Sequence, residues 1–158
     1  MRDFSTVYSL RNIPAAYALY AGGKGPTYVA YVGITGRLKE RIIEHLIRRD
    51  SSVTKATAAV NLKPDYVTKL RWWEHSDFNN PTMLKAAEVV AFDVLNPVLN
   101  SRGRIDNAAR DLLSKKTFVN KMRKLFESDS NGRIDFYSLT DAMDRIKALE
   151  RRLDELTK

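Results

Sequence analysis

The spacing of apolar residues predicts a small sheet at the start of the chain. Residues 17–21 and 27–33 are short runs rich in Tyr, Ala and Val, and the segment between them holds three glycines and a proline. Aromatic and β-branched residues favour strands, whereas glycine and proline favour turns. The two runs therefore predict a β-hairpin. Residues 66–75, which contain Val67, Leu70, Trp72 and Trp73, predict a third strand.

Apolar residues recur every three or four positions in four segments that follow the hairpin. This spacing predicts helices over residues 37–49, 82–95, 107–126 and 138–156. Pro81 stands just before the second of them, where proline suits the start of a helix. Between the last two helices, residues 128–132 end in Asn-Gly, which predicts a turn.

The last predicted helix carries a heptad seam, with apolar residues at alternating gaps of three and four. The seam consists of Leu139, Ala142, Ile146, Leu149, Leu153 and Leu156. Such a seam is typical of paired helices. It favours a homodimer through residues 138–156 and, equally, docking of this helix on the rest of its own chain.

The order of the elements predicts an α/β (α+β) fold, in which a small three-stranded antiparallel sheet is flanked by helices. The 158 residues are enough for one domain with its own core. We expect an N-terminal arm or short helix at residues 1–13, the domain at 14–100 and a helical extension at 101–158.

The charge of the chain indicates what kind of partner the protein binds. The chain has 27 Lys and Arg against 19 Asp and Glu, a net charge of +8, and a pI near 9.8. Residues 101–126 hold 8 basic and 2 acidic residues, whereas residues 127–158 hold 6 and 8. A basic surface of this kind favours a polyanion, most simply DNA. Lys115 and Lys116, inside the basic segment, are expected to contact its phosphates.

Two absences set the expected location. The chain has no cysteine, so it can form neither a disulfide nor a cysteine metal site. Its N-terminus lacks the apolar run of a signal peptide, and no stretch approaches the roughly 20 apolar residues that span a bilayer. We expect a cytoplasmic, nucleoid-associated protein with no membrane partner.

A few polar side chains stand out against this pattern. Glu88 lies inside an otherwise apolar predicted helix, where a buried carboxylate needs a partner such as Arg41 or a metal ion. The guanidinium of Arg41 has the fork of donors that suits phosphate. His45, one helical turn later, can transfer protons, as can the tyrosines of the hairpin. Taken alone, such a tyrosine is more often a core residue than a catalytic one, such a histidine is more often a surface residue, and such a glutamate is usually solvated.

As a set, these residues resemble the GIY-YIG nuclease family over about residues 14–100. The "GIY" element corresponds to Ala15-Ala16-Tyr17 and the "YIG" element to Tyr31-Val32-Gly33. Further positions that match are Leu38, Arg41, His45, Glu88, the Asn96-Pro97 pair and Asn100. Two departures are evident. The first motif lacks its glycine, and its tyrosine lies 14 residues before Tyr31, so that Tyr20 competes with Tyr17 as the motif tyrosine.

The resemblance implies hydrolysis of DNA phosphodiester bonds with one Mg²⁺ or Mn²⁺ bound by Glu88. Arg41 would stabilise the phosphate, and Tyr31 or Tyr17, helped by His45, would activate the attacking water. Asn100 would brace the site. The resemblance also implies DNA-backbone contacts from Arg37 and Lys39, and we expect the same of Arg48 from its place on the helix.

Two other functions are compatible with the sequence. A catalytically inactive nucleic-acid-binding module could have the same fold, although the polar residues expected of a nuclease are present. Alternatively, the protein could serve mainly as an interaction protein that dimerises through its C-terminal helix. A nuclease that pairs two copies would be suited to double-strand cuts, whereas a monomer would more naturally nick.

Overall fold

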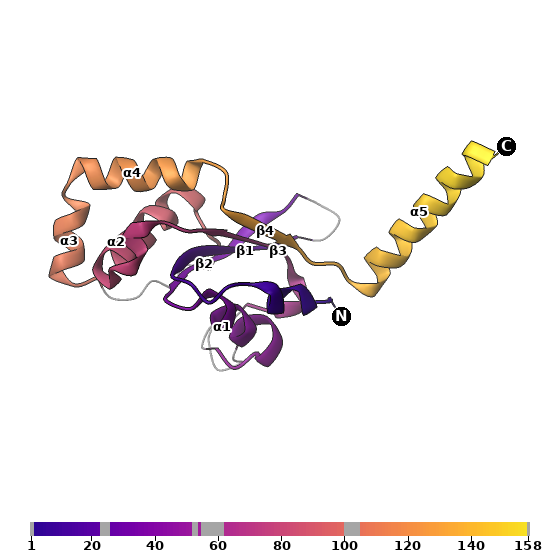
Figure 1. Cartoon of the computed structure of the whole chain (residues 1–158), viewed down its shortest axis with the longest axis horizontal. Helices are drawn as coiled ribbons and strands as arrows, with labels where there is room; N and C mark the ends of the chain where they lie inside the picture. Colours follow the sequence, from indigo (N-terminus) through magenta and orange to yellow (C-terminus); the bar gives the residue numbers. More distant parts are fainter. Residues whose placement is uncertain (1, 23–25, 52–53, 55–61, 100–104, 158) are drawn as a thin grey trace.

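A computed structural model describes residues 2–22, 26–51, 54, 62–99 and 105–157 of the chain (Figure 1). Its centre is an antiparallel sheet with the strand order β2-β1-β3-β4. The strands are β1 (Ala15–Ala21), β2 (Tyr28–Thr35), β3 (Val67–Trp73) and β4 (Gly132–Asp135). The three predicted strands are confirmed, but the expected number was wrong, because the sheet has a fourth strand.

The fourth strand starts at Gly132, the last residue of the predicted turn. Asn131, just before it, is tied to the end of β3: its side chain accepts a hydrogen bond of 2.7 Å from the backbone N–H of Glu74, and its own N–H donates to the Trp72 carbonyl at 2.9 Å. Directly after it, Gly132 pairs with Trp72 of β3. A side chain on Gly132 would collide with the indole of Trp72, with 2.0 Å between its Cβ and the ring. Glycine therefore allows β4 to lie against β3, and a strand of four residues is too short to show a period.

Helices cover both faces of this sheet (Figure 1). On one face lie the N-terminal 3₁₀ turn η1 (Ser5–Ser9), α1 (Leu38–Ile43) and η2 (Glu44–Arg48). On the other face lie α2 (Pro81–Leu95), α3 (Asn107–Leu113) and α4 (Lys116–Glu127). The chain also forms two short 3₁₀ turns, η3 (Pro64–Tyr66) before β3 and η4 (Ser76–Asn79) after it. β1 is consequently buried along its whole length, and its successive side chains alternate between two apolar cores.

The segment after the predicted domain contributes to one of these cores. Phe118, Met122 and Phe126, each four residues apart on α4, are buried together with side chains of α2. Residues at this spacing share one face of a helix. The predicted single helix over 107–126 was wrong, since the chain bends at Ser114 and forms α3 and α4. The bend lets Ala109 and Phe118 enter the same core.

Two helix ends have a distinct local structure. The side chain of Asn80 accepts hydrogen bonds from the backbone N–H groups of Thr82 and Met83, which caps α2 next to Pro81. The predicted helix at 37–49 is present, but its second half, η2, is a π-helix that ends at Arg49 in the left-handed conformation, with φ of 58°. Such π segments are frequent at functional sites.

The last helix, α5 (Leu139–Thr157), extends away from the layered body (Figure 1). Its start is tied to the N-terminus by a β-bridge between Arg2 and Ser138 and by an ion pair of 3.1 Å between Arg2 and Asp141. Beyond this point its apolar side chains are exposed. No helix in the described ranges is long and apolar enough to cross a membrane.

Candidate active site

Tyr17 and His45 form the centre of the candidate site. Tyr17 lies in the middle of β1, and His45 lies on η2 above the same face of the sheet. A hydrogen bond of 2.6 Å joins the Tyr17 hydroxyl to His45 Nε2, and both side chains are 0% exposed. Tyr20, the competing tyrosine, belongs to the other core, where its hydroxyl accepts a hydrogen bond of 2.9 Å from Arg71. Tyr17 is therefore the tyrosine that faces the histidine.

Gly33 makes room for this tyrosine. It stands opposite Tyr17 in the register of β1 and β2. A Cβ on Gly33 would lie 2.5 Å from the Tyr17 hydroxyl oxygen and 3.0 Å from the Tyr31 ring. Tyr31 shares this face, and its ring centre is 6.0 Å from that of Tyr17 and 5.5 Å from that of His45. The Tyr-Val-Gly motif thus lets three rings gather at one place.

The second nitrogen of the His45 ring has a partner that the sequence does not reveal. His45 Nδ1 lies 2.8 Å from the Ser51 hydroxyl oxygen, and Ser51 is only 4% exposed. Thr54 Oγ1 is a further 3.0 Å from that oxygen. Ser51 belongs to a polar segment without periodicity, so no spacing signal could have found it. Burial, with a smaller effect of the charge on Arg41, lowers the pKa of His45 to about 3. The imidazole is therefore neutral at physiological pH.

Arg41 lies one helical turn before His45 on α1 and is half-buried. Its Nη1 atom donates a hydrogen bond of 2.9 Å to the carboxylate of Glu44, a residue that the sequence analysis did not select. Burial raises the pKa of both Tyr17 and Tyr31, and the positive charge of Arg41 acts in the opposite direction on each. The guanidinium is thus close enough to both hydroxyls to influence their protons.

Glu88 comes from the helical layer that covers the other face of the sheet. It is half-buried on α2, and its negative charge helps to raise the pKa of Tyr31, after the larger effect of burial. The predicted Asn100 lies outside the described residues.

A metal ion held by the described residues would have at most two ligands from His, Cys, Asp and Glu side chains. Among the residues that are described, no three His, Cys, Asp or Glu side chains are placed to hold a metal ion together. Mg²⁺ is commonly bound by one or two carboxylates, with water and substrate phosphate completing its coordination. Glu88, whose charge acts on Tyr31, supplies a carboxylate of the kind that such a site uses.

The predicted DNA contacts fall into two groups. Arg37 precedes α1, and Lys39 and Arg48 belong to α1 and η2, on the face of the sheet that carries His45. Lys115 and Lys116 begin α4, in the layer that covers the opposite face. Arg37 pairs with Glu40 at 2.9 Å, and Arg48 pairs with Asp50 at 2.6 Å. The structure therefore does not gather all five into one patch.

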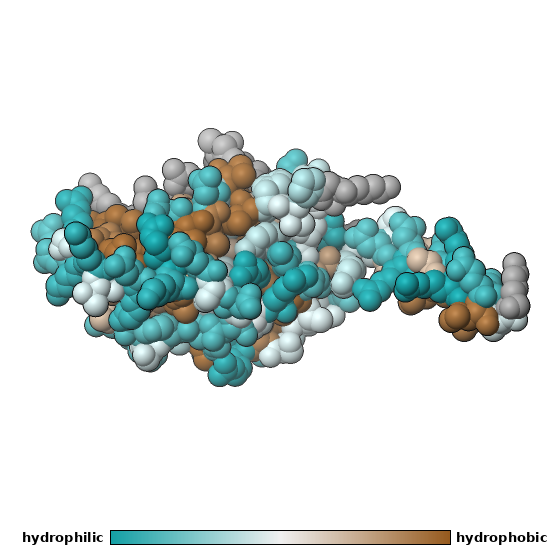
Figure 2. Space-filling model, turned by 90° about the horizontal axis from the view of Figure 1, so that it is seen from above, coloured by the Kyte–Doolittle hydropathy of each residue, from teal (hydrophilic) through white to brown (hydrophobic). Residues whose placement is uncertain are grey.

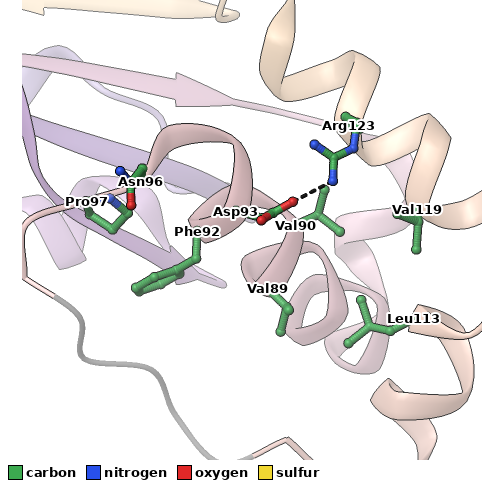
Figure 3. A pocket seen from close by; sticks show the side chains of 9 residues that line it. All are labelled: Val89, Val90, Phe92, Asp93, Asn96, Pro97, Leu113, Val119 and Arg123. Carbon is green, nitrogen blue, oxygen red and sulfur yellow. Dashed lines mark hydrogen bonds and ion pairs between the residues drawn. The ribbon is translucent and has the colours of Figure 1, made fainter.

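A separate pocket of about 450 Å³ lies between α2, α3 and α4 (Figure 3). Valine, leucine and phenylalanine side chains line it, and an ion pair between Arg123 and Asp93 spans its rim at 2.5 Å. Of the candidate catalytic residues that the structure describes, none lines this pocket. The pocket is therefore separate from the Tyr17–His45 centre.

Comparison of the chain with protein-family models, with curated proteins and with solved structures finds no match. The case for a function consequently depends on the chain's own residues and their geometry.

Proposed function

We propose that the protein is a divalent-metal-dependent DNA endonuclease of the GIY-YIG type. One observation carries the proposal: Tyr17 and His45 share a buried hydrogen bond of 2.6 Å directly beside Arg41 and Tyr31. These residues come from two strands and from the continuous α1–η2 helix, and they are the residues of the sequence motif. A core built only for stability needs no such set of proton-transferring groups.

Arg41 is the group suited to bind the scissile phosphate. Its guanidinium is half-buried and is oriented by Glu44, so its position is fixed before DNA arrives. A fixed donor fork acts on the negative charge that develops on the phosphate in the transition state. The phosphate would lie between Arg41 and Tyr31.

The tyrosines and His45 provide a path for the proton of the attacking water. At rest both tyrosines carry their protons and His45 is neutral. As the water oxygen bonds to phosphorus, its proton passes to the Tyr31 oxygen, Tyr31 gives its proton to Tyr17, and Tyr17 gives its own to His45 Nε2. The bond from phosphorus to the leaving sugar oxygen breaks, and that oxygen takes a proton from solvent. The phosphate anion makes His45 easier to protonate, because nearby negative charge raises the pKa of a histidine.

Glu88 would hold the metal ion, Mg²⁺ or Mn²⁺. When bound, such an ion supplies positive charge that stabilises the departing oxygen. The role of Glu88 in the proposal is to supply one carboxylate, whose charge already acts on Tyr31. In the proposal Asn100 braces the same site.

DNA is the partner that the charge of the chain supports. With a net charge of +8, contacts from Arg37, Lys39, Arg48, Lys115 and Lys116 would neutralise backbone phosphates without reading sequence. A cytoplasmic, nucleoid-associated location follows from this role. Two copies paired through residues 138–156 would suit the enzyme to double-strand cuts.

One observation favours a second candidate, a nucleic-acid-binding module without catalytic activity. In the described part of the chain, no group of three metal-ligating side chains is assembled. Such a module would bind DNA through the same basic residues and leave it intact.

A supercoiled-plasmid assay separates the two candidates. With Mg²⁺ or Mn²⁺, the wild-type protein should convert the plasmid to nicked or linear DNA, and Glu88→Gln should lose this activity while it still retards DNA in a gel. Glu155→Gln, which removes one exposed carboxylate of α5, serves as the matched control and should cut normally. Absence of cutting by the wild type with every metal and substrate tested, together with retained binding, would support the inactive module instead.

A further inference from the structure

The exposed apolar stripe of α5 is the feature that the catalytic proposal does not explain. Its large apolar side chains are between 49% and 83% exposed, and they are Met143, Ile146, Leu149, Leu153 and Leu156. Figure 2 shows hydrophobic residues along one side of this helix, where it projects from the body. Helices in proteins owe most of their stability to packing of such a face, whereas α5, with 19 residues, leaves this face in solvent. We therefore expect the stripe to pack against a partner.

The positions of these residues indicate which kind of partner fits. Leu139, Ile146 and Leu153 occupy the first apolar position of the heptad, and Ala142, Leu149 and Leu156 occupy the fourth. A β-branched residue at a first position, here Ile146, with leucine at the fourth favours a parallel coiled coil of two strands. The best complement to a heptad stripe is another heptad stripe, and a second copy of this chain carries one.

The charges beside the stripe select the orientation of the pair. Arg145 and Arg152 flank the first apolar positions, and Glu150 flanks a fourth position on the other side. In a parallel pair, Arg145 of each copy faces Glu150 of the other copy, which gives two attractive contacts. In an antiparallel pair like flanks face each other, so arginine would meet arginine. Charge complementarity thus favours the parallel arrangement.

We propose that α5 pairs with α5 of a second copy as a parallel two-stranded coiled coil. Because α5 follows the body in the chain, a parallel pair holds both bodies at the same end of the coil. An antiparallel pair would place them at opposite ends, about 28 Å apart along a helix of this length. This inference stands whether or not the protein cuts DNA, and its test involves no DNA.

Sedimentation equilibrium of the full chain tests the pairing. The mass should rise from 18.0 kDa towards twice that value as protein concentration increases. Arg145→Glu and Glu150→Arg should each weaken the dimer, by about four- to thirtyfold in dissociation constant, since two attractive contacts become repulsive. A mixture of the two variants should associate again, because each altered charge then faces its opposite. Arg151→Glu, on the outer side of the helix, is the matched control and should associate like the wild type.

Disulfide formation tests the orientation. The chain has no cysteine of its own, so a single introduced cysteine reports on one position. In a parallel pair, equivalent fourth positions lie side by side, within reach of a disulfide. Ala142→Cys and Leu156→Cys should therefore each cross-link to their counterparts under mild oxidation, whereas Arg151→Cys should not.

Three results would overturn the proposal. A mass of one chain at every concentration would mean that α5 does not pair with itself. Stronger association of Arg145→Glu than of the wild type would indicate an antiparallel pair, as would a dimer in which neither Ala142→Cys nor Leu156→Cys cross-links. Far-UV circular dichroism of each variant would show whether the helical content is retained.

Discussion

His45 is held neutral between two hydroxyl groups, and this arrangement defines its chemistry. Nε2 faces the Tyr17 hydroxyl at 2.6 Å, and Nδ1 faces the Ser51 hydroxyl at 2.8 Å. A hydroxyl can donate or accept, so either neutral tautomer of the ring is satisfied. If Ser51 accepts from Nδ1, Nε2 is free to accept the proton of Tyr17. In the proposed proton path, Ser51 would therefore be a positioning residue.

The buried histidine should make stability depend on pH. Its folded-state pKa is lowered by burial to about 3, below the ordinary value of 6.5, so between these values the unfolded chain binds a proton that the folded protein does not. Stability is then lost as pH falls through this window, with a slope of up to about 1.4 kcal/mol per pH unit from this one group. Urea unfolding of His45→Gln at several pH values should show a slope that is smaller by this amount.

His75→Gln offers the comparison, because His75 is half-buried and bonded within its own turn. If both substitutions change the slope equally, or if His45→Gln leaves it unaltered, the buried neutral state assigned to His45 is wrong.

Among the elements, the hairpin of β1 and β2 can hold the candidate site because residue 33 is a glycine, which leaves room for the Tyr17 ring. Gly33 lies directly under the Tyr17 hydroxyl, and a methyl group there would come within 2.5 Å of it. Any larger residue must displace Tyr17 and so break its contact with His45. The Tyr-Val-Gly motif is thus a packing requirement of the tyrosine on the neighbouring strand.

Gly33→Ala should consequently destabilise the protein by about 1–3 kcal/mol, the usual cost of overpacking a core. Gly36→Ala is the matched control, since no atom lies within 4 Å of the position that its Cβ would take, and it should change stability by less than about 0.5 kcal/mol. The free energy of unfolding of both variants, measured in urea, is the observable. Equal stability of the two would show that Tyr17 does not depend on Gly33 for its place.

The sequence predicted the elements with strong periods and missed those set by tertiary contact. Three strands and the helix at α2 appear where the apolar spacing places them. β4 was missed because its four residues become a strand only by pairing with β3, against the ring of Trp72. The bend between α3 and α4 likewise depends on burial against α2. The motif residues were selected through their resemblance to a nuclease family. Glu44 could have been found from its i,i+3 spacing to Arg41, whereas Ser51 acts through a tertiary contact that no spacing encodes.

For the whole molecule, the basic charge is divided between two layers. Arg37, Lys39 and Arg48 lie with α1 and η2, and Lys115 and Lys116 lie at the start of α4. A DNA duplex that contacts both groups would have to reach the layers on both faces of the sheet.

Salt dependence measures this contact. Each phosphate contact contributes about one to the slope of log K against log salt concentration, so the double variant Lys115→Ala and Lys116→Ala should bind DNA with a slope smaller by about two. Lys147→Ala, on the exposed and more acidic α5, should keep the wild-type slope. Fluorescence anisotropy with a labelled duplex at several salt concentrations gives both values. An unchanged slope in the double variant would exclude α4 from the DNA contact.

Single-turnover cleavage of a labelled DNA duplex by Tyr31→Phe tests whether Tyr31 belongs to the active site. The variant removes one hydroxyl from the proposed proton path, and it should cut at least about a hundredfold more slowly than the wild type while its DNA affinity is unchanged. Tyr28→Phe, which removes the hydroxyl of a half-exposed tyrosine on the same strand, should cut at the wild-type rate. Equal rates for Tyr31→Phe and the wild type would contradict the assignment of the active site.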